Sequence, residues 1–220
     1  NKINRNWNLF YPFIPAIFAG AFIALGAFGS QVAMCASNKV VSAIVFSIGL
    51  ISVVFTQSEL FTGNCLLFIP LLKKQIKMPR LLLHGLLVFI GNFIGSFLVA
   101  YFVRRAGLVP EIVDEMALIK TQTPASQLFI RGILCNILVC AAVYFSQQAD
   151  STIGKIFSIM LPVALFVICG FEHSIANMYF IPVAVGGQML LILNNLIPVT
   201  LGNIVGGFIF SWYIFNKESN

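Results

Sequence analysis

Gly170-Phe171-Glu172-His173-Ser174-Ile175-Ala176-Asn177 places an acid, a base and an amide inside an otherwise apolar run. Around this stretch, 59% of the 220 residues are hydrophobic, only 9% are charged, and the mean hydropathy is +0.96. A water-soluble domain of this size does not have such a composition, so the chain is an integral membrane protein. Polar groups held in such surroundings are costly and are usually functional.

The apolar runs have the length of helices. A membrane helix needs about 20 mostly apolar residues, whereas a membrane barrel strand needs about 10 residues of alternating polarity. Runs such as 13–32 and 81–103 are continuous, which predicts an all-α membrane protein with one transmembrane domain over residues 1–220. The expected helices lie near residues 12–36, 40–72, 79–106, 123–147, 153–185 and 189–216.

The basic residues predict the orientation of the chain. Six spans would place both termini on one side. That side would carry Lys2, Arg5, Lys73, Lys74, Lys77, Arg80, Lys155 and Lys217. The other would carry Lys39, Arg104, Arg105, Lys120 and Arg131. By the positive-inside rule the termini are cytoplasmic, in a multi-pass protein of the cell membrane. The formal charge of +6 therefore reflects topology, and no nucleic-acid partner is expected.

The polar segment 108–123 carries Glu111, Asp114, Glu115 and Lys120. We expect a short external connection over the membrane surface whose charges are solvated. His84, close to the start of the third expected helix, is expected at the membrane interface.

Two of the expected helices are too long for one straight span, and each has a polar cluster near its middle. The run 40–72 is interrupted at Ser58-Glu59-Leu60-Phe61-Thr62-Gly63-Asn64, and the run 153–185 at the stretch quoted first. Lipid cannot satisfy irregular backbone, so such breaks face protein or a water-filled path. Helices 2 and 5 are therefore expected to be broken.

The two halves of the chain share features at similar spacing. The corresponding positions are Gly20 with Gly132, Glu59 with Glu172, Asn64 with Asn177, and the stretch 91–95 with 202–206. Three helices followed by three similar ones form an inverted 3+3 repeat, here about 12–106 and about 123–216. Paired broken helices in such a repeat indicate a central permeation site. The Gly-x-x-x-Gly spacings at 91–95 and 202–206 predict close helix packing.

Four motifs resemble the signatures of the formate/nitrite transporter family, in order across essentially the whole chain. They are Ser58–Asn64, Cys135-Asn136-Ile137-Leu138-Val139-Cys140, Gly170–Met178 and Leu201-Gly202-Asn203-Ile204-Val205-Gly206-Gly207. The resemblance implies an aquaporin-like six-helix protomer and a homopentamer with one pore per protomer. It also implies small monovalent anions as substrates, among them formate, nitrite and hydrosulfide.

The resemblance makes His173 the central pore histidine, close to Thr62 and Asn136. Independently of any family, histidine has an unperturbed pKa of about 6.5, so it can donate to an anion or exchange a proton with it. The alternative is a histidine that is merely hydrogen-bonded between helices. Glu172 and Glu59 are expected to hold the broken helices, since a buried carboxylate needs donors, and Asn64 and Asn177 are expected to close the breaks similarly.

The family alignment also implies two apolar constrictions, with Leu60 and Phe166 on the external side and Phe46 and Leu50 on the cytoplasmic side. Narrow apolar rings gate by excluding water. Taken singly, each of these residues could be ordinary core. Lys155 opens the fifth helix, and two roles stay open for it: an anchor at the membrane surface, or a vestibule charge that concentrates anions.

The sequence thus predicts a passive channel for small monovalent anions or their conjugate weak acids. A proton-coupled secondary transporter of the same anions is the alternative. An intramembrane enzyme using Glu172 and His173 is disfavoured, because no paired nucleophile is evident. Cys169 and His173 lie one helical turn apart but are too few for a metal site, so neither metal nor cofactor is expected.

Overall fold

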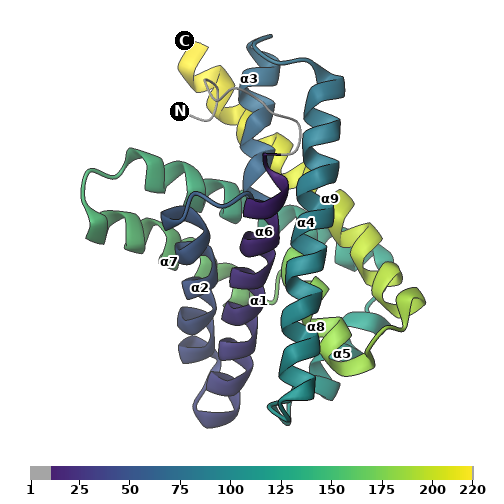
Figure 1. Cartoon of the computed structure of the whole chain (residues 1–220). Helices are drawn as coiled ribbons and strands as arrows, with labels where there is room; N and C mark the ends of the chain where they lie inside the picture. The colour runs from purple at the N-terminus through teal and green to yellow at the C-terminus, as the bar shows by residue number, and fades with distance from the viewer. Residues whose placement is uncertain (1–10, 220) are drawn as a thin grey trace.

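The computed structural model describes residues 11–219, and in that part of the chain every regular element is a helix (Figure 1). In chain order they are α1 (Phe13–Ala36), α2 (Lys39–Phe55), the 3₁₀ helix η2 (Gly63–Leu67), α3 (Phe68–Leu72), α4 (Met78–Arg105), α5 (Val113–Gln122), α6 (Ala125–Gln148), α7 (Thr152–Cys169), α8 (Ser174–Val185) and α9 (Met189–Ser219). Lys2 and Arg5 lie outside the described residues. The expected all-helical class is confirmed.

Both expected interruptions are present. The run 40–72 divides after Phe55 and resumes at Gly63 as the short helices η2 and α3. The run 153–185 divides between Cys169 and Ser174, where α7 gives way to α8. Residues 56–62 and 170–173 therefore form two non-helical breaks, called here the first and the second break.

Five of the described helices, α1, α4, α6, α7 and α9, are long and apolar enough to cross a membrane. Shorter apolar helices lie at 39–55, 63–72 and 174–185. The outer faces of the helices carry exposed large apolar side chains, such as Phe18, Leu82 and Trp212. Such a surface suits lipid rather than water.

Glycines bring two helix pairs into close contact. In Figure 1, α1 lies between α2 and α4, and it packs against both. A Cβ atom on Gly95 of α4 would collide with the carbonyl oxygen of Ile17 in α1. Likewise, a Cβ atom on Gly206 of α9 would collide with the carbonyl oxygen of Ile133 in α6. The close packing predicted from the Gly-x-x-x-Gly spacings is confirmed at these two crossings.

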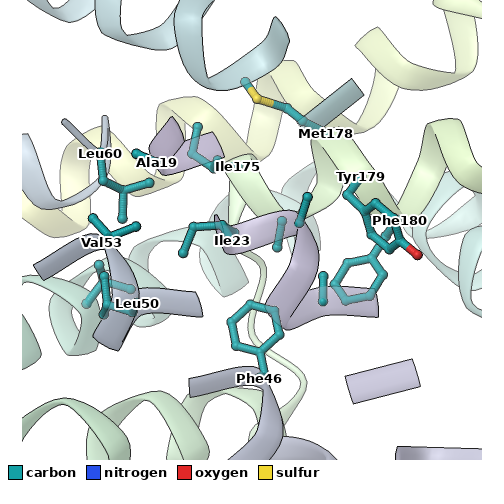
Figure 2. Packing of buried hydrophobic residues seen from close by; sticks show 14 of the residues in the cluster. Ala19, Ile23, Phe46, Leu50, Val53, Leu60, Ile175, Met178, Tyr179 and Phe180 are labelled. Carbon is teal, nitrogen blue, oxygen red and sulfur yellow. The ribbon is translucent and has the colours of Figure 1, made fainter. Parts of the chain in front are cut away.

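The buried core surrounds the two breaks. Figure 2 shows side chains of α1, α2 and α8 meeting there, among them Ile23, Phe46 and Tyr179. α8 is the most enclosed element, with every residue from Ser174 to Val183 buried. The polar residues of the second break are therefore held inside protein, away from any lipid.

Candidate functional site

Gly170 ends α7 and starts the second break. Its φ of 71° lies in the left-handed region, which glycine enters at little cost. The next amide, of Phe171, donates to the carbonyl of Phe166 at 3.0 Å, and the amide of Glu172 donates to the carbonyl of Arg131 at 3.3 Å. These bonds turn the chain sharply and tie the break to α6.

His173 caps the first turn of α8 with its own side chain. The backbone amide of Ala176 donates to Nδ1 at 3.1 Å, so Nδ1 carries no proton. In the neutral ring the proton is then on Nε2, which donates to the Thr62 hydroxyl oxygen at 2.8 Å. The phenyl ring of Phe166 stacks on the imidazole, with centroids 6.0 Å apart. The backbone thus fixes both the tautomer and the orientation of this histidine.

Thr62 comes from the first break and reaches the same point. It precedes η2 and is fully buried. Its carbonyl accepts from the Cys140 thiol of α6, with the sulfur 3.6 Å away. Because His173 donates to the Thr62 oxygen, the hydroxyl proton of Thr62 is left to donate to another group. The two breaks therefore meet through one hydrogen bond between Thr62 and His173, called here the central pair.

The structure links Asn136 to the central pair through α9. Its Nδ2 donates to the carbonyl of Asn203 at 2.6 Å. Its Oδ1 is buried and has no hydrogen-bond partner among the described residues. A buried acceptor without a partner is costly, so this oxygen is suited to meet a water or another donor. The expected trio thus has Thr62 and His173 in contact, with Asn136 joined to them indirectly.

Asn92 of α4 holds the first break. Its Nδ2 donates to the carbonyls of Ala16 at 2.7 Å and Glu59 at 2.9 Å. Its Oδ1 accepts from the amide of Phe61 at 2.9 Å. One fully buried side chain therefore satisfies backbone groups on both sides of Leu60.

Asn203 of α9 holds the second break in the same way. Its Nδ2 donates to the carbonyls of Gly132 at 2.8 Å and Glu172 at 2.9 Å. Its Oδ1 accepts from the amide of Ser174 at 2.9 Å. The sequence motifs around Asn92 and Asn203 were expected only to pack helices. In each motif the asparagine follows the first glycine of a Gly-x-x-x-Gly spacing, where the neighbouring backbone comes close. This position was the sequence signal that could have predicted a contact with backbone.

The carboxylate of Glu59 lies beside the first break and is buried. It accepts from Nδ2 of Asn64 at 2.8 Å, and the same Nδ2 lies 3.2 Å from Nε2 of His84. The His84 ring nitrogen is 3.7 Å from the Glu59 carboxylate. His84, expected at the membrane interface, is only 8% exposed, because α4 turns it toward this carboxylate.

The carboxylate of Glu172 lies beside the second break. It accepts from Nδ2 of Asn177 at 2.6 Å, and that amide also donates to Oδ1 of Asn195 at 2.7 Å. The Nζ of Lys120 lies 3.0 and 2.9 Å from its two oxygens and 5.2 Å from the ring centroid of Phe180. Both ends of this ion pair are largely buried.

The expectation that the charges of 108–123 are solvated is wrong for Lys120. The segment forms α5, which buries Val113 and Ala117 and packs against α8 and α9. Lys120, one turn further along the same helix, is thereby turned inward to Glu172. Glu111, Asp114 and Glu115 are exposed, as expected.

The four apolar residues expected at constrictions are all buried. Phe46 lies edge-on against Phe166, with centroids 5.7 Å apart. Leu50 and Leu60 instead line one cavity, and Figure 2 shows them beside Val53 and apart from Phe46. Which of the four residues narrow the pathway together stays a prediction.

The cavity that Leu50 and Leu60 line has a volume of about 680 Å³. Its other lining residues include Gln57, Ser58 and Asn64 of the first break region and Lys73, Tyr144, Gln147, Gln148 and Glu218 from α6 and the ends of α3 and α9. Lys155 is exposed on α7 and is not among the residues that line this cavity.

Comparison with known proteins identifies relatives over nearly the whole chain. The model of the formate/nitrite transporter family matches residues 1–215. A probable formate transporter of Methanothermobacter thermautotrophicus is 39% identical, covering 92% of this chain and 88% of that protein. The formate channel FocA of Haemophilus influenzae is 33% identical, covering 91% and 84%.

Solved structures agree with this relationship. A channel described as an FNT family ion channel superposes with a TM-score of 0.88 at 30% identity, covering 94% of this chain and 91% of that one. A pentameric formate channel with formate bound superposes with a TM-score of 0.81 at 30% identity, covering 98% and 100%. Sequence and fold together show that this multi-pass membrane protein belongs to the formate/nitrite transporter family.

Proposed function

We propose that the protein is a passive channel for small monovalent anions or their conjugate weak acids, with formate as the first substrate. The observation that carries the proposal is the Thr62–His173 contact where the two helix breaks meet. The relatives named as formate transporters and formate channels support formate in particular. Nitrite and hydrosulfide are further candidates, being anions of comparable size and charge.

The proposed assembly is a homopentamer of six-span protomers with both termini in the cytoplasm. Two of the six spans are composite: α2 with η2 and α3, and α7 with α8. The matching bonds of Asn92 and Asn203 support an inverted repeat, because each joins a carboxylate residue's carbonyl to the amide two residues further on. The pentameric formate channel with the same fold supports the oligomeric state.

In the proposed pathway, an anion reaches the central pair between two apolar constrictions. Phe46 and Phe166 form one, and Leu50 and Leu60 form the other. The hydroxyl of Thr62 donates to the anion, because His173 already donates to its oxygen. The Oδ1 of Asn136 is available to a protonated acid or to a water that accompanies the anion.

Protonation would lower the barrier at the constrictions. A bare anion loses its hydration in a dry apolar ring at a cost of many kcal/mol, whereas a neutral weak acid loses far less. Lys120 supplies positive charge close to the central pair, although Glu172 compensates most of it. Formic acid would cross the ring and release its proton beyond it, so we expect flux to rise as external pH falls.

Formate flux through purified protein in liposomes tests the proposal. We expect rapid downhill flux of formate, with nitrite and hydrosulfide compared in the same assay, and a rate that increases toward acidic external pH. Flux at the level of empty liposomes would overturn the channel. A slow, saturating flux that moves one proton with each formate would instead support a proton-coupled transporter.

The variant His173→Gln tests the role of the central pair. Glutamine has no titratable group, so the pH dependence or the selectivity between anions should change while expression and assembly are retained. Cys169→Ser, one turn earlier and exposed, serves as the control. Wild-type pH dependence and selectivity in His173→Gln would reduce His173 to a helix cap.

A further inference from the structure

We propose that Lys73 is an anion-binding site at the mouth of the cavity, and that the carboxylate of Glu218 occupies this site until a permeating formate displaces it. The inference rests on the proposed function for its choice of formate. It concerns a part of the molecule remote from the central pair, on the far side of Leu50 and Leu60.

The geometry is that of a bound carboxylate. Lys73 follows the last residue of α3, and Glu218 lies near the end of α9; Figure 1 shows these helix ends close together. The Nζ of Lys73 is 2.6 Å from one Glu218 oxygen, and the Tyr144 hydroxyl is 3.4 Å from the other. A lysine and a phenol thus hold one carboxylate between them, each at a separate oxygen.

All three of these residues line the cavity that leads to Leu50 and Leu60. The remaining polar lining includes Ser58 of the first break and Gln147 and Gln148 at the end of α6, whose amides can donate to an anion that enters the cavity. A formate ion that replaces Glu218 on Lys73 would therefore stand at the start of a polar path toward the constriction.

The exposure of the Lys73–Glu218 ion pair to solvent favours the exchange of the Glu218 carboxylate for formate. The Lys73 and Glu218 side chains are 34% and 38% exposed, and ion pairs that solvent reaches contribute little net stability. Formate presents the same functional group as the glutamate side chain. The glutamate is tethered and so competes at a high local concentration, but it is held only by the last turn of α9.

The pair also sets the charge of the cavity. Among the described residues, Lys73 and Glu218 are the only charged ones that line the cavity, so their charges cancel there. When the Glu218 carboxylate leaves, Lys73 gives the cavity a positive charge that attracts anions. Glu218 therefore acts as a built-in competitor that limits anion occupancy at this end of the pathway.

Five variants test the inference: Glu218→Gln, Lys73→Gln, the double variant, Glu218→Asp, and Lys217→Gln as the control. Lys217 is exposed on the same turn of α9 and is outside the cavity lining. Binding of ¹³C-formate to the purified pentamer is followed by NMR line broadening. Formate flux into liposomes is measured at formate concentrations well below saturation, in low and in high salt.

Glu218→Gln should strengthen formate binding and raise flux about two- to fivefold at low ionic strength, with the gain lost in high salt, where charges are screened. Lys73→Gln should weaken binding, and the double variant should behave like Lys73→Gln. Lys217→Gln should match the wild type. Glu218→Asp, which keeps the competing carboxylate, should stay close to the wild type and checks that assembly is preserved.

Unchanged binding and flux in Glu218→Gln would overturn the inference, as would a gain in that variant that survives the removal of Lys73. The binding measurement separates this inference from the channel proposal. Binding that responds to these variants without any wild-type flux would overturn the channel and support the Lys73 site.

Discussion

The two helix breaks are built on the same frame but carry different chemistry. In each, a buried asparagine bridges a glutamate carbonyl and an amide two residues further on, and a second asparagine donates to the glutamate carboxylate. The positions that form the central pair are not equivalent: Leu60 stands where the second break has His173, and Thr62 stands where it has Ile175. The repeated part therefore shapes the backbone, and the unrepeated part supplies the chemistry.

The breaks also differ in their charge. Glu172 is paired with Lys120 in the second break, whereas Glu59 lies beside His84 in the first. The chain resumes as the twelve-residue helix α8 after the second break and as a short 3₁₀ helix after the first. This contrast defines four experiments.

The largest effect is expected from Lys120→Met, which removes the cation specific to the second break. It leaves the Glu172 carboxylate buried without its counter-charge, at a cost of about 3 kcal/mol in unfolding free energy. Unfolding in detergent measures this cost, and Lys120→Met with Glu172→Gln should recover part of it. Glu115→Gln, exposed on α5, is the control. Wild-type stability in Lys120→Met would show that the ion pair is dispensable.

Asn92→Leu and Asn203→Leu test the repeated frame. Each leaves a buried amide and a buried carbonyl without partners, so each should reduce the unfolding free energy by about 2 kcal/mol. The same unfolding measurement applies. Asparagine-to-aspartate variants keep the acceptor and remove the donor, and thus show which bonds matter. A large loss at one position and none at the other would contradict the equivalence of the two frames.

Thr62→Val tests the unrepeated chemistry. It removes the hydroxyl while keeping the shape, so the donor that faces the anion is lost and only the Nε2–H of His173 is left to donate. We expect formate flux to fall about tenfold, equivalent to about 1.4 kcal/mol of barrier, while Thr62→Ser retains most of it. Liposome flux measures both variants. Equal flux in the two would mean that the hydroxyl does not contact the permeating species.

The smallest effect is expected from His84→Asn, which makes the first break resemble the second, where Asn195 takes the corresponding place beside Asn177. The amide can accept from Asn64 as Asn195 accepts from Asn177, so stability should change by less than about 1 kcal/mol. His84→Leu, which offers no acceptor, should cost more in the same unfolding measurement. A larger loss in His84→Asn than in His84→Leu would show a role for this histidine that the second break lacks.

The sequence was sufficient for the class of protein, the positions of both breaks and the family. Length and hydropathy report on the membrane directly, and Ser58–Asn64 and Gly170–Asn177 are polar clusters in otherwise apolar runs. These are local signals, readable from neighbouring residues. The six-span count and the inverted repeat stay predictions, since they require a membrane position and a superposition of the halves.

The details missed were those set by contacts between distant residues. Lys120 belongs to a polar segment between helices, and only the packing of α5 under α8 turns it toward Glu172. Asn92 and Asn203 bond to backbone atoms of distant residues, and their place beside packed glycines does not say which residues those are. The contact of Phe46 with Phe166 depends on how α2 and α7 are rotated about their axes, which hydrophobicity alone does not fix.

The hydrogen bond from the Ala176 amide to Nδ1 of His173 bears on how protons cross the membrane. A proton wire through an imidazole takes up a proton on one nitrogen and releases it from the other. Here Nδ1 faces the backbone N–H of Ala176, which donates a hydrogen bond but cannot accept a proton from the ring, so the relay stops at the ring. In the proposed channel, a proton would cross only together with an anion, so the open pathway would not leak protons when no formate is present.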